Sequence, residues 1–497
     1  MRFVVFGATG YIGGRLVPEL LAAGHEVRVV VRSPEKLADV PWAESVEVMR
    51  GDVTDEDSVR RALQGQEGLY YLVHSLNRAD FPVVDATAAR NVARAAREAG
   101  IGRIIYLGGI VPDSPHLSAH LASRAEVGRI LLDSGVPTAV LQAAVIIGSG
   151  SASFEMLRYL TERLPAMITP QWVHNRVQPI AVRDVLHYLV HAAELPADVS
   201  RSFDIGGPEV LTYREMMRRY AIVAGLPRRV VVAVPVLTPW LSAQWVNLVT
   251  PVPRSIAVPL IESLIHEVVC HEEDIRGYIP DPEQGRTPYE RSLELALARI
   301  RRADVPTRWS DARTPTAPSD PLPTDPDWSG GTIYEDSREH PTSADPAALW
   351  DVIESIGGER GWYSFPLAWS VRGWADRLVG GVGLRRGRRD PRRLRVGEAL
   401  DWWRVEYIDR PKVLRLRAEM KLPGLAWLEL GVGRDEEGGT LYRQRAIFIP
   451  HGLAGQLYWK SIAPFHGVVF GGMVRNITES AERAKDETEI TEITEPE

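Results

Sequence analysis

A glycine-rich turn near the start of the chain constrains its fold more than any other feature. Gly7, Gly10 and Gly13 follow a short apolar run, residues 3–6, and precede an amphipathic stretch, residues 11–21. A strand, a turn of this kind and a helix, in this order, form the phosphate-binding part of a dinucleotide site. The first glycine permits the tight turn, the second lets a pyrophosphate approach the backbone, and the third lets the helix pack closely on the strand. The helix N-terminus then offers free N–H groups to the phosphates. We therefore expect dinucleotide binding by Gly7, Ala8, Thr9, Gly10, Tyr11, Ile12 and Gly13.

Strand and helix patterns continue to alternate through the first half of the chain. Apolar runs at residues 27–31, 69–73, 103–107 and 138–141 are separated by helical patterns at residues 57–63, 84–99 and 121–132. This alternation predicts an α/β fold, a doubly wound Rossmann sheet of parallel strands with right-handed crossovers. The pattern then loosens, and we expect residues 145–300 to form a small substrate-facing lobe of a domain that spans residues 1–300.

The second half of the chain has a different composition. Residues 301–331 are rich in proline, aspartate, serine and threonine, which predicts an exposed linker. Asp345 and Pro346 mark a helix start, and a last helical segment covers residues 458–481. The strand-like stretches between them are residues 399–407, 413–420, 426–433 and 441–448. We expect an α+β domain over residues 332–482 and a disordered acidic tail, residues 483–497. Side chains alternate along a strand, so Trp402 and Trp403 should face opposite sides of the sheet.

Composition argues against several classes of function. The net charge of −7 gives no reason to expect binding to nucleic acid. The longest apolar region, residues 230–269, contains five prolines, so we expect no integral membrane segment. A single cysteine, Cys270, excludes an internal disulfide. The reducing compartment that this implies, and the lack of a signal peptide pattern, favour a cytoplasmic location.

The end of the second predicted strand discriminates between NAD(H) and NADP(H). An NAD site usually has an acidic residue there to bind the ribose hydroxyls. This chain has Arg32 at that place and Lys36 soon after it. A guanidinium matches a 2′-phosphate in charge and geometry, so we predict NADP(H) as the preferred cofactor, with NAD(H) as the alternative. A solvated turn with ordinary surface charges is the competing interpretation. Asp52 and Val53, after the third strand, are candidates for contact with the adenine ring.

Several motifs together resemble those of one known family. They are the glycine turn, Arg32, the Gly51-Asp52-Val53 segment, the Tyr71-Leu72-Val73-His74-Ser75 segment and the Phe203-Asp204-Ile205-Gly206-Gly207-Pro208 segment. Over residues 1–300 the chain resembles an atypical extended short-chain dehydrogenase/reductase of the NmrA-like group. The resemblance implies a Rossmann domain whose nicotinamide lies over the ends of the fourth and fifth strands. The residues expected there are His74, Ser75 and Gly108.

The chain departs from this family where catalysis is expected. Active members pair a serine with a Tyr-x-x-x-Lys motif, and here His120 and Arg124 stand at the places of the tyrosine and the lysine. In one interpretation His120 is the proton donor, because its usual pKa suits acid–base work at neutral pH, and Arg124 binds the ribose. In the other, catalysis is lost and the pair only binds cofactor or caps the helix. Asn175 and Gln178 are candidates for the pocket lining, and Asp184 for a helix cap.

The C-terminal domain resembles a START-related helix-grip domain of the polyketide-cyclase type. The resemblance rests on residues 397–405, 457–459 and 464–466 and implies an apolar ligand. Three functions are then open: an NADP(H)-dependent reductase of a carbonyl or quinone-like apolar substrate, an NADP(H)-sensing regulator without turnover, and an apolar-ligand carrier. The sequence predicts a small-molecule partner and no particular oligomeric state.

Overall fold

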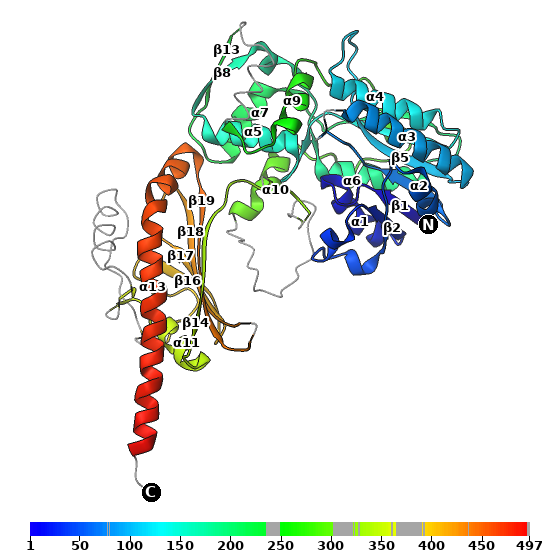
Figure 1. Cartoon of the computed structure of the whole chain (residues 1–497). Coiled ribbons are helices and arrows are strands. Elements are labelled where there is room, and N and C mark those ends of the chain that lie inside the picture. The colour runs from blue at the N-terminus through cyan, green and yellow to red at the C-terminus, as the bar shows by residue number, and fades with distance from the viewer. Residues whose placement is uncertain are drawn as a thin grey trace. The chain divides into compact units, whose positions relative to one another are not determined.

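The computed structural model divides the chain into two compact units, unit 1 (Met1–Gly331) and unit 2 (Thr332–Glu497). Each is described by itself here and can be followed by colour in Figure 1. The structure describes all residues except 77, 79, 235–248, 302–321, 323, 327–328, 359–360, 364–389, 391–392, 436 and 495–497. Most of the predicted linker thus lies outside the described residues. Among the described helices, none is long and apolar enough to cross a membrane.

Unit 1 is built on a seven-stranded parallel sheet. Its strands are β1 (Arg2–Phe6), β2 (Glu26–Val31), β3 (Glu47–Arg50), β4 (Gly68–Tyr71), β5 (Arg103–Gly109), β6 (Thr138–Ala143) and β11 (Arg201–Ile205). Their order across the sheet is β11-β6-β5-β4-β1-β2-β3, and every neighbouring pair is parallel. The predicted Rossmann topology is therefore confirmed. The chain reverses its direction of travel across the sheet between β1 and β4, which is where such folds bind ligands.

Helices cover both faces of this sheet and create two separate cores. One face packs against α1 (Tyr11–Ala22) and α6 (Val182–His191), through residues such as Leu16 and Val185. The other packs against α2 (Glu56–Leu63), α3 (Phe81–Glu98) and α4 (Ala119–Leu132), through residues such as Val92 and Val127. Short 3-10 turns connect these elements at η1 (Pro34–Leu37), η2 (Ala43–Ser45), η4 (Ala192–Glu194) and η5 (Asp274–Gly277).

A smaller lobe with its own apolar core completes unit 1. Its helices are α5 (Ala152–Arg163), α7 (Tyr213–Val223), α9 (Arg254–Ser263) and α10 (Tyr289–Arg301), together with the turn η3 (Gln171–His174). The lobe's short strands pair as β7 (Ile146–Ile147) with β10 (Ile180–Ala181), β8 (Ala166–Pro170) with β13 (Val230–Val234), and β9 (Arg176–Val177) with β12 (Leu211–Thr212). Thr212 and Glu215 form a capping box at the start of α7.

The end of the predicted linker is part of unit 1 and is held there by buried contacts. Leu322 is buried, and its side chain lies against Gly14 of α1. Both carboxylate oxygens of Asp325 accept hydrogen bonds from Arg15, at 2.9 and 2.6 Å. The Gly330 N–H donates to Glu155 at 3.0 Å. The expectation of an exposed linker is therefore wrong for this stretch, because apolar and charged partners far along the chain retain it.

Unit 2 is an α+β structure, as predicted. A six-stranded antiparallel sheet has the order β14-β19-β18-β17-β16-β15. Its strands are β14 (Tyr334–Thr342), β15 (Ala399–Leu400), β16 (Trp403–Asp409), β17 (Val413–Ala418), β18 (Gly424–Arg434) and β19 (Thr440–Pro450). Two helices, α11 (Pro346–Glu354) and α13 (Gly452–Thr494), pack against each other, and their side chains form one core with the sheet. Asp345 caps α11 by accepting from the Ala347 N–H, with Pro346 at the first helical position.

Two expectations for unit 2 are wrong. Asp401 has a positive φ of +54° and turns the chain between β15 and β16, so Trp402 lies in the turn rather than on a strand. Trp402 and Trp403 both pack in the same core, with ring centroids 5.4 and 6.0 Å from that of Trp362. The acidic end is not a separate disordered tail, because α13 continues through Thr494.

Candidate functional site

The glycine turn has the geometry that a dinucleotide site requires. Gly7 has a φ of +94°, and a Cβ there would lie 2.7 Å from the Leu72 carbonyl oxygen. A Cβ on Gly13 would lie 2.2 Å from the Gly7 carbonyl oxygen. These two glycines are therefore required by the fold. Gly10 differs, because it is exposed and a Cβ there would meet only the Gly7 oxygen, at 3.2 Å.

The turn ends in the first turn of α1, where Gly10 is the N-cap residue. The N–H groups of Tyr11, Ile12 and Gly13 precede the first residue that can bond back into the helix, so they are available to an anion. The side chain of Tyr11 takes no part in this. Its ring packs under the Arg15 guanidinium, 4.1 Å from the ring centroid, and across Gly148 of the lobe. Ala8 is buried and Thr9 is partly buried, so this segment offers backbone rather than side chains to a ligand.

Candidate cofactor residues follow the carboxyl ends of β2 and β3, beside the glycine turn in the sheet. Arg32 and Lys36 are both exposed, and neither has an ion-pair partner in the described part of the chain. Asp52 accepts hydrogen bonds from the Thr54 backbone N–H and hydroxyl, at 2.9 and 2.8 Å. The Val53 carbonyl accepts from Asn91 at 3.2 Å. The cations are thus open to a ligand, whereas Asp52 and Val53 mainly shape their own loop.

The ends of β4 and β5 lie on the other side of the glycine turn and meet the start of α4. The Arg124 guanidinium lies 3.4 Å from the hydroxyl of Tyr106, which is on β5. Nδ1 of His120 lies 3.2 Å from the hydroxyl of Ser263, at the end of α9 in the lobe. His74 is exposed and Ser75 is partly buried. The sheet order and these contacts place the predicted nicotinamide-side residues on neighbouring elements.

The charge state of His120 differs from the sequence expectation. Burial, and after it the positive charge of Arg124, together lower its pKa to about 3. At neutral pH the ring is therefore neutral, and His120 holds no imidazolium proton to give away. The expected match between its pKa and neutral pH is wrong, because the sequence does not reveal the arginine and the burial together.

Sequence reasoning missed several residues around Arg124. Asp85 of α3 is buried, and burial raises its pKa although the charge of Arg124 opposes this. One Asp85 oxygen, Oδ1, and the hydroxyls of Tyr71 and Ser123 are buried with no hydrogen-bond partner among the described residues. A carboxylate on an otherwise alanine-rich helix face is the one sequence signal that could have singled out Asp85.

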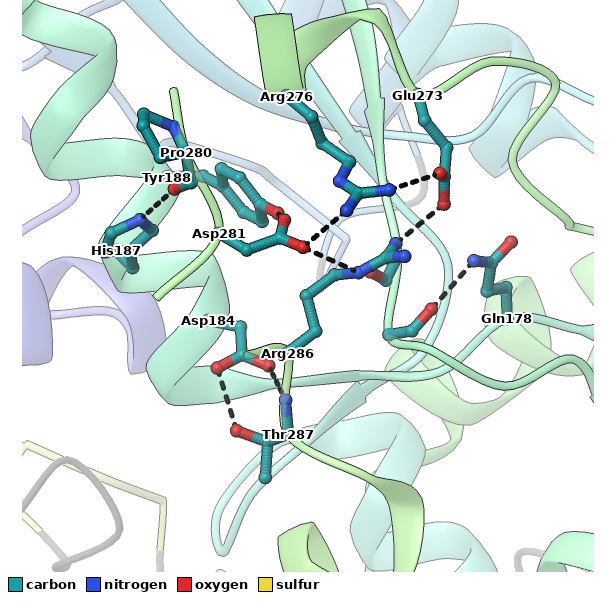
Figure 2. A network of polar contacts seen from close by, with 12 residues as sticks. Gln178, Asp184, His187, Tyr188, Glu273, Arg276, Pro280, Asp281, Arg286 and Thr287 are labelled. Atoms are coloured by element: carbon teal, nitrogen blue, oxygen red, sulfur yellow. Dashed lines mark hydrogen bonds and ion pairs between the residues drawn. The ribbon is translucent and has the colours of Figure 1, made fainter. Parts of the chain in front are cut away.

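The candidate pocket residues of the lobe have structural roles instead. Figure 2 shows the network that ties the segment after α9 to α6 and β11. Asp184 accepts from the Thr287 N–H at 2.7 Å and from its hydroxyl at 2.8 Å, and it does not cap α6, whose N-cap is Ala181. Gln178 donates to the Gly207 carbonyl at 2.8 Å (Figure 2). Asn175 likewise donates to the Leu264 carbonyl at 2.9 Å. These amides hold backbone groups of the lobe, and their place in a substrate pocket stays a prediction.

Two family models match different parts of the chain. A model described as NAD(P)H-binding matches residues 7–144. A model described as a protein of unknown function (DUF2867) matches residues 328–473, which is most of unit 2. An uncharacterized protein of Mycobacterium tuberculosis is 28% identical over 228 residues, which are 46% of this chain and 24% of that protein. The chain thus spans about a quarter of the length of this relative.

Other relatives have named activities or solved structures. A (4-alkanoyl-5-oxo-2,5-dihydrofuran-3-yl)methyl phosphate reductase of Streptomyces griseus is 27% identical over 234 residues, 46% of this chain and 75% of that protein. Triphenylmethane reductase of Citrobacter, in complex with NADP(H), has a TM-score of 0.48 and 22% identity, covering 60% of this chain and all of that one. An NADPH-dependent quinone oxidoreductase of Escherichia coli has a TM-score of 0.47 and 20% identity. The match covers 59% of this chain and 98% of that one. The N-terminal part of the chain thus has a Rossmann-type fold, and residues 7–144 of it match a family model described as NAD(P)H-binding.

Proposed function

We propose that unit 1 is an NADP(H)-dependent oxidoreductase that reduces a carbonyl or quinone-like apolar compound. The observation that carries the proposal is the glycine turn, in which Gly7 and Gly13 have no room for a side chain whereas Gly10 is exposed. This leaves the first N–H groups of α1 open to a pyrophosphate, which the helix dipole also attracts. The NAD(P)H-binding family model and the reductase of Streptomyces griseus support the same reaction class.

The preference for NADP(H) rests on two cations. Arg32 follows β2, where an NAD-binding domain usually has a carboxylate, and Lys36 lies one short turn further on. Both are exposed and without an ion-pair partner among the described residues. A guanidinium can bind a 2′-phosphate through two parallel hydrogen bonds, which a ribose hydroxyl cannot match.

The chemistry requires a hydride, which NADPH would supply when bound, stabilisation of the negative charge on the substrate oxygen, and a proton, which solvent water would give to that oxygen. We assign that stabilisation to Arg124, which is cationic, partly buried and one helical turn from His120. His120 is neutral at pH 7, so its contribution is to bind and orient the substrate rather than to deliver an imidazolium proton. The contact of His120 with Ser263 supports a substrate position between α4 and the lobe.

Calorimetry followed by a substrate screen tests this proposal. We expect the full chain to bind NADPH more tightly than NADH, and to oxidise NADPH in the presence of quinones or ketones. A His120→Ala variant should lose turnover while it keeps its NADPH affinity, because the side chain bonds to Ser263 of the lobe and not to the glycine turn. No heat of binding with either reduced cofactor at millimolar concentration would overturn the proposal.

A second candidate is an NADP(H) sensor without turnover. Two observations favour it: histidine and arginine replace the tyrosine and lysine of active relatives, and the pKa of His120 is lowered to about 3. Tight NADPH binding with no consumption of NADPH across a broad panel of quinones, ketones and aldehydes would favour the sensor. Turnover of any of them above the rate without protein would exclude it.

For unit 2 we propose an apolar-ligand site of the START-like, helix-grip kind. The antiparallel sheet shares one core with α11 and α13, and that core contains the indoles of Trp362, Trp402 and Trp403. Nε1 of Trp403 is buried and has no hydrogen-bond partner among the described residues. Such a donor inside an apolar core suits a ligand with one acceptor group. Native mass spectrometry of the full chain should detect a retained adduct, and its absence after gentle purification from several hosts would contradict the proposal.

A further inference from the structure

Ser263 joins the lobe to the predicted catalytic helix through a single hydroxyl. It is the last residue of α9, and its Oγ has three close polar neighbours. The Pro259 carbonyl oxygen lies at 2.9 Å, the Ser118 Oγ at 2.9 Å and the His120 Nδ1 at 3.2 Å. Ser118 is the N-cap residue of α4, the helix that carries His120 and Arg124.

Counting protons shows which of these groups donates. The Pro259 carbonyl can only accept, so the one proton of the Ser263 hydroxyl goes to it. Ser118 accepts from the Leu121 N–H at 3.2 Å, which leaves its own proton free to donate to Ser263. The remaining contact is then a hydrogen bond only if His120 Nδ1 carries a hydrogen and donates it. All three contacts can form at once in this arrangement alone.

We propose that Ser263 is a positioning residue that holds His120 as the neutral Nδ1–H tautomer, so that Nε2 is a hydrogen-bond acceptor. The role in catalysis rests on the proposed reductase function, whereas the tautomer itself does not. Because the two ring nitrogens point in different directions, Nε2 is turned away from the Ser263 hydroxyl.

An acceptor at Nε2 selects the kind of group that binds there. It suits a hydroxyl or an amine N–H and does not suit a bare carbonyl oxygen, which has no proton to share. We therefore infer that His120 binds a hydroxyl of the substrate, such as the phenol of a hydroxylated quinone or the hydroxyl of a hydroxyketone. The substrate class of the site is thus narrowed from carbonyl compounds to carbonyl compounds that also carry a hydrogen-bond donor.

Nitrogen NMR of the histidine rings in the full-length protein tests the tautomer directly. Selective ¹⁵N labelling of histidine, with His120 assigned by the signals lost in His120→Gln, distinguishes a protonated Nδ1 from a protonated Nε2. We expect His120 to be Nδ1–H in the native chain and to shift toward Nε2–H, the form that free imidazole side chains favour, in Ser263→Ala. Ser263→Thr keeps the hydroxyl and should keep the Nδ1–H form.

A matched control separates this role from helix stability. Ser292 of α10 also donates to the carbonyl of a proline four residues earlier, Pro288, at 3.0 Å, and no histidine contact accompanies it among the described residues. Ser292→Ala should therefore leave the His120 signals unchanged. A native His120 with its proton on Nε2, or a Ser263→Ala spectrum identical to the native one, would overturn the proposal.

Kinetics give the second readout. Ser263→Ala should lower kcat for a hydroxylated quinone by about tenfold or more, because the substrate hydroxyl loses a correctly placed acceptor and the substrate its orientation, with unchanged NADPH affinity. Ser263→Thr should restore most of kcat, and a quinone without a hydroxyl should be far less affected by either change. If no substrate is turned over, the proposed function fails while the NMR result still decides the tautomer. If turnover occurs but the native tautomer is Nε2–H, the inference about Ser263 fails alone.

Discussion

At the residue scale, the three glycines of the first turn have separable roles. A Gly13→Ala side chain would meet the Gly7 carbonyl oxygen at 2.2 Å, so we expect it to destabilise unit 1 by about 1–3 kcal/mol, as overpacking usually does. Gly10→Ala meets only one protein atom, at 3.2 Å, so we expect it to fold normally and to lose NADPH affinity by about tenfold or more, since the methyl group occupies the approach of the pyrophosphate.

Urea denaturation and calorimetry on the two variants check this separation. Gly277→Ala serves as a control for the added methyl group alone, because Gly277 has no positive φ and nothing lies within 4 Å of a Cβ at that position. Equal NADPH affinity of native and Gly10→Ala protein would argue against a phosphate site at this turn.

We attribute the preference for NADPH over NADH mainly to one side chain, that of Arg32. Removing the guanidinium in Arg32→Ala should weaken NADPH binding by about 10- to 100-fold, the range for a hydrogen bond to a charged group, and leave NADH binding unchanged. Lys36→Ala should have a smaller effect, because an ammonium cannot bind a phosphate through a planar fork. Calorimetry with both cofactors measures this, and a parallel loss of NADH affinity would assign Arg32 a role in folding instead.

Sequence analysis predicted correctly the residues whose structural role depends only on their neighbours in the chain. A glycine at Gly7 or Gly13 is required by backbone atoms within the same strand–turn–helix unit, so spacing alone identifies it. The state of His120 was not accessible in this way. It depends on burial, on Arg124 and on Ser263, which lies 143 residues further along the chain.

At the element scale, the ion pair between Arg15 of α1 and Asp325 holds the last described stretch of unit 1. Both side chains are almost fully buried, at 2% and 4% exposure. Asp325→Ala leaves the guanidinium without its carboxylate in the interior, so we expect a loss of about 3–5 kcal/mol in the free energy of unfolding. The exposed pair Arg129–Asp133 is the matched control, and Asp133→Ala should cost about 0.5 kcal/mol or less. If urea denaturation shows that Asp325→Ala and Asp133→Ala lower the free energy of unfolding equally, this prediction is wrong.

In unit 2, Glu354 joins α11 to the turn between β16 and β17. Burial alone would raise its pKa, but hydrogen bonds from Arg410, the Leu394 N–H and Trp350 outweigh burial and lower it. A carboxylate with a lowered pKa stabilises the fold above its usual pKa, and this contribution is lost as the pH falls through the lowered value. We expect Glu354→Gln to be less stable than the native protein at pH 7 and to approach its stability as the pH falls through the lowered pKa of Glu354. Denaturation midpoints at several pH values measure this, and a pH-independent difference would contradict it.

Periodicity and capping signals predicted most of the elements, because these too are local. The strand β14 was missed, since its sequence, Tyr334–Thr342, is mostly charged and polar and is retained by pairing with β19. Trp402 was misplaced because one positive φ, at Asp401, converts an expected strand into a turn. In both cases the partner or the backbone geometry, rather than the residue type, decides the structure.

At the scale of the whole molecule, the division into two units makes the boundary of unit 1 testable. Composition placed the end of the first domain at residue 300, whereas the compact unit extends to Gly331. The difference lies in Leu322, Asp325 and Gly330, which contact Gly14, Arg15 and Glu155. The biased composition of this stretch predicted a linker, so sequence analysis missed that part of it packs against the cofactor-binding half.

Two truncated chains decide where the cofactor-binding unit ends. A chain of residues 1–331 keeps the Asp325 carboxylate and should unfold in one transition and bind NADPH with the affinity of the full protein. A chain of residues 1–300 leaves Arg15 buried without that carboxylate and uncovers the face of α1 on which Leu322 rests. We expect it to be less stable by about 3–5 kcal/mol or more, the cost of breaking a buried ion pair. If both chains unfold at the same urea concentration, residues 322–331 contribute no stability and the boundary belongs at the end of α10. If only the longer chain binds NADPH, the packing of this segment on α1 is what keeps the glycine turn in its binding geometry.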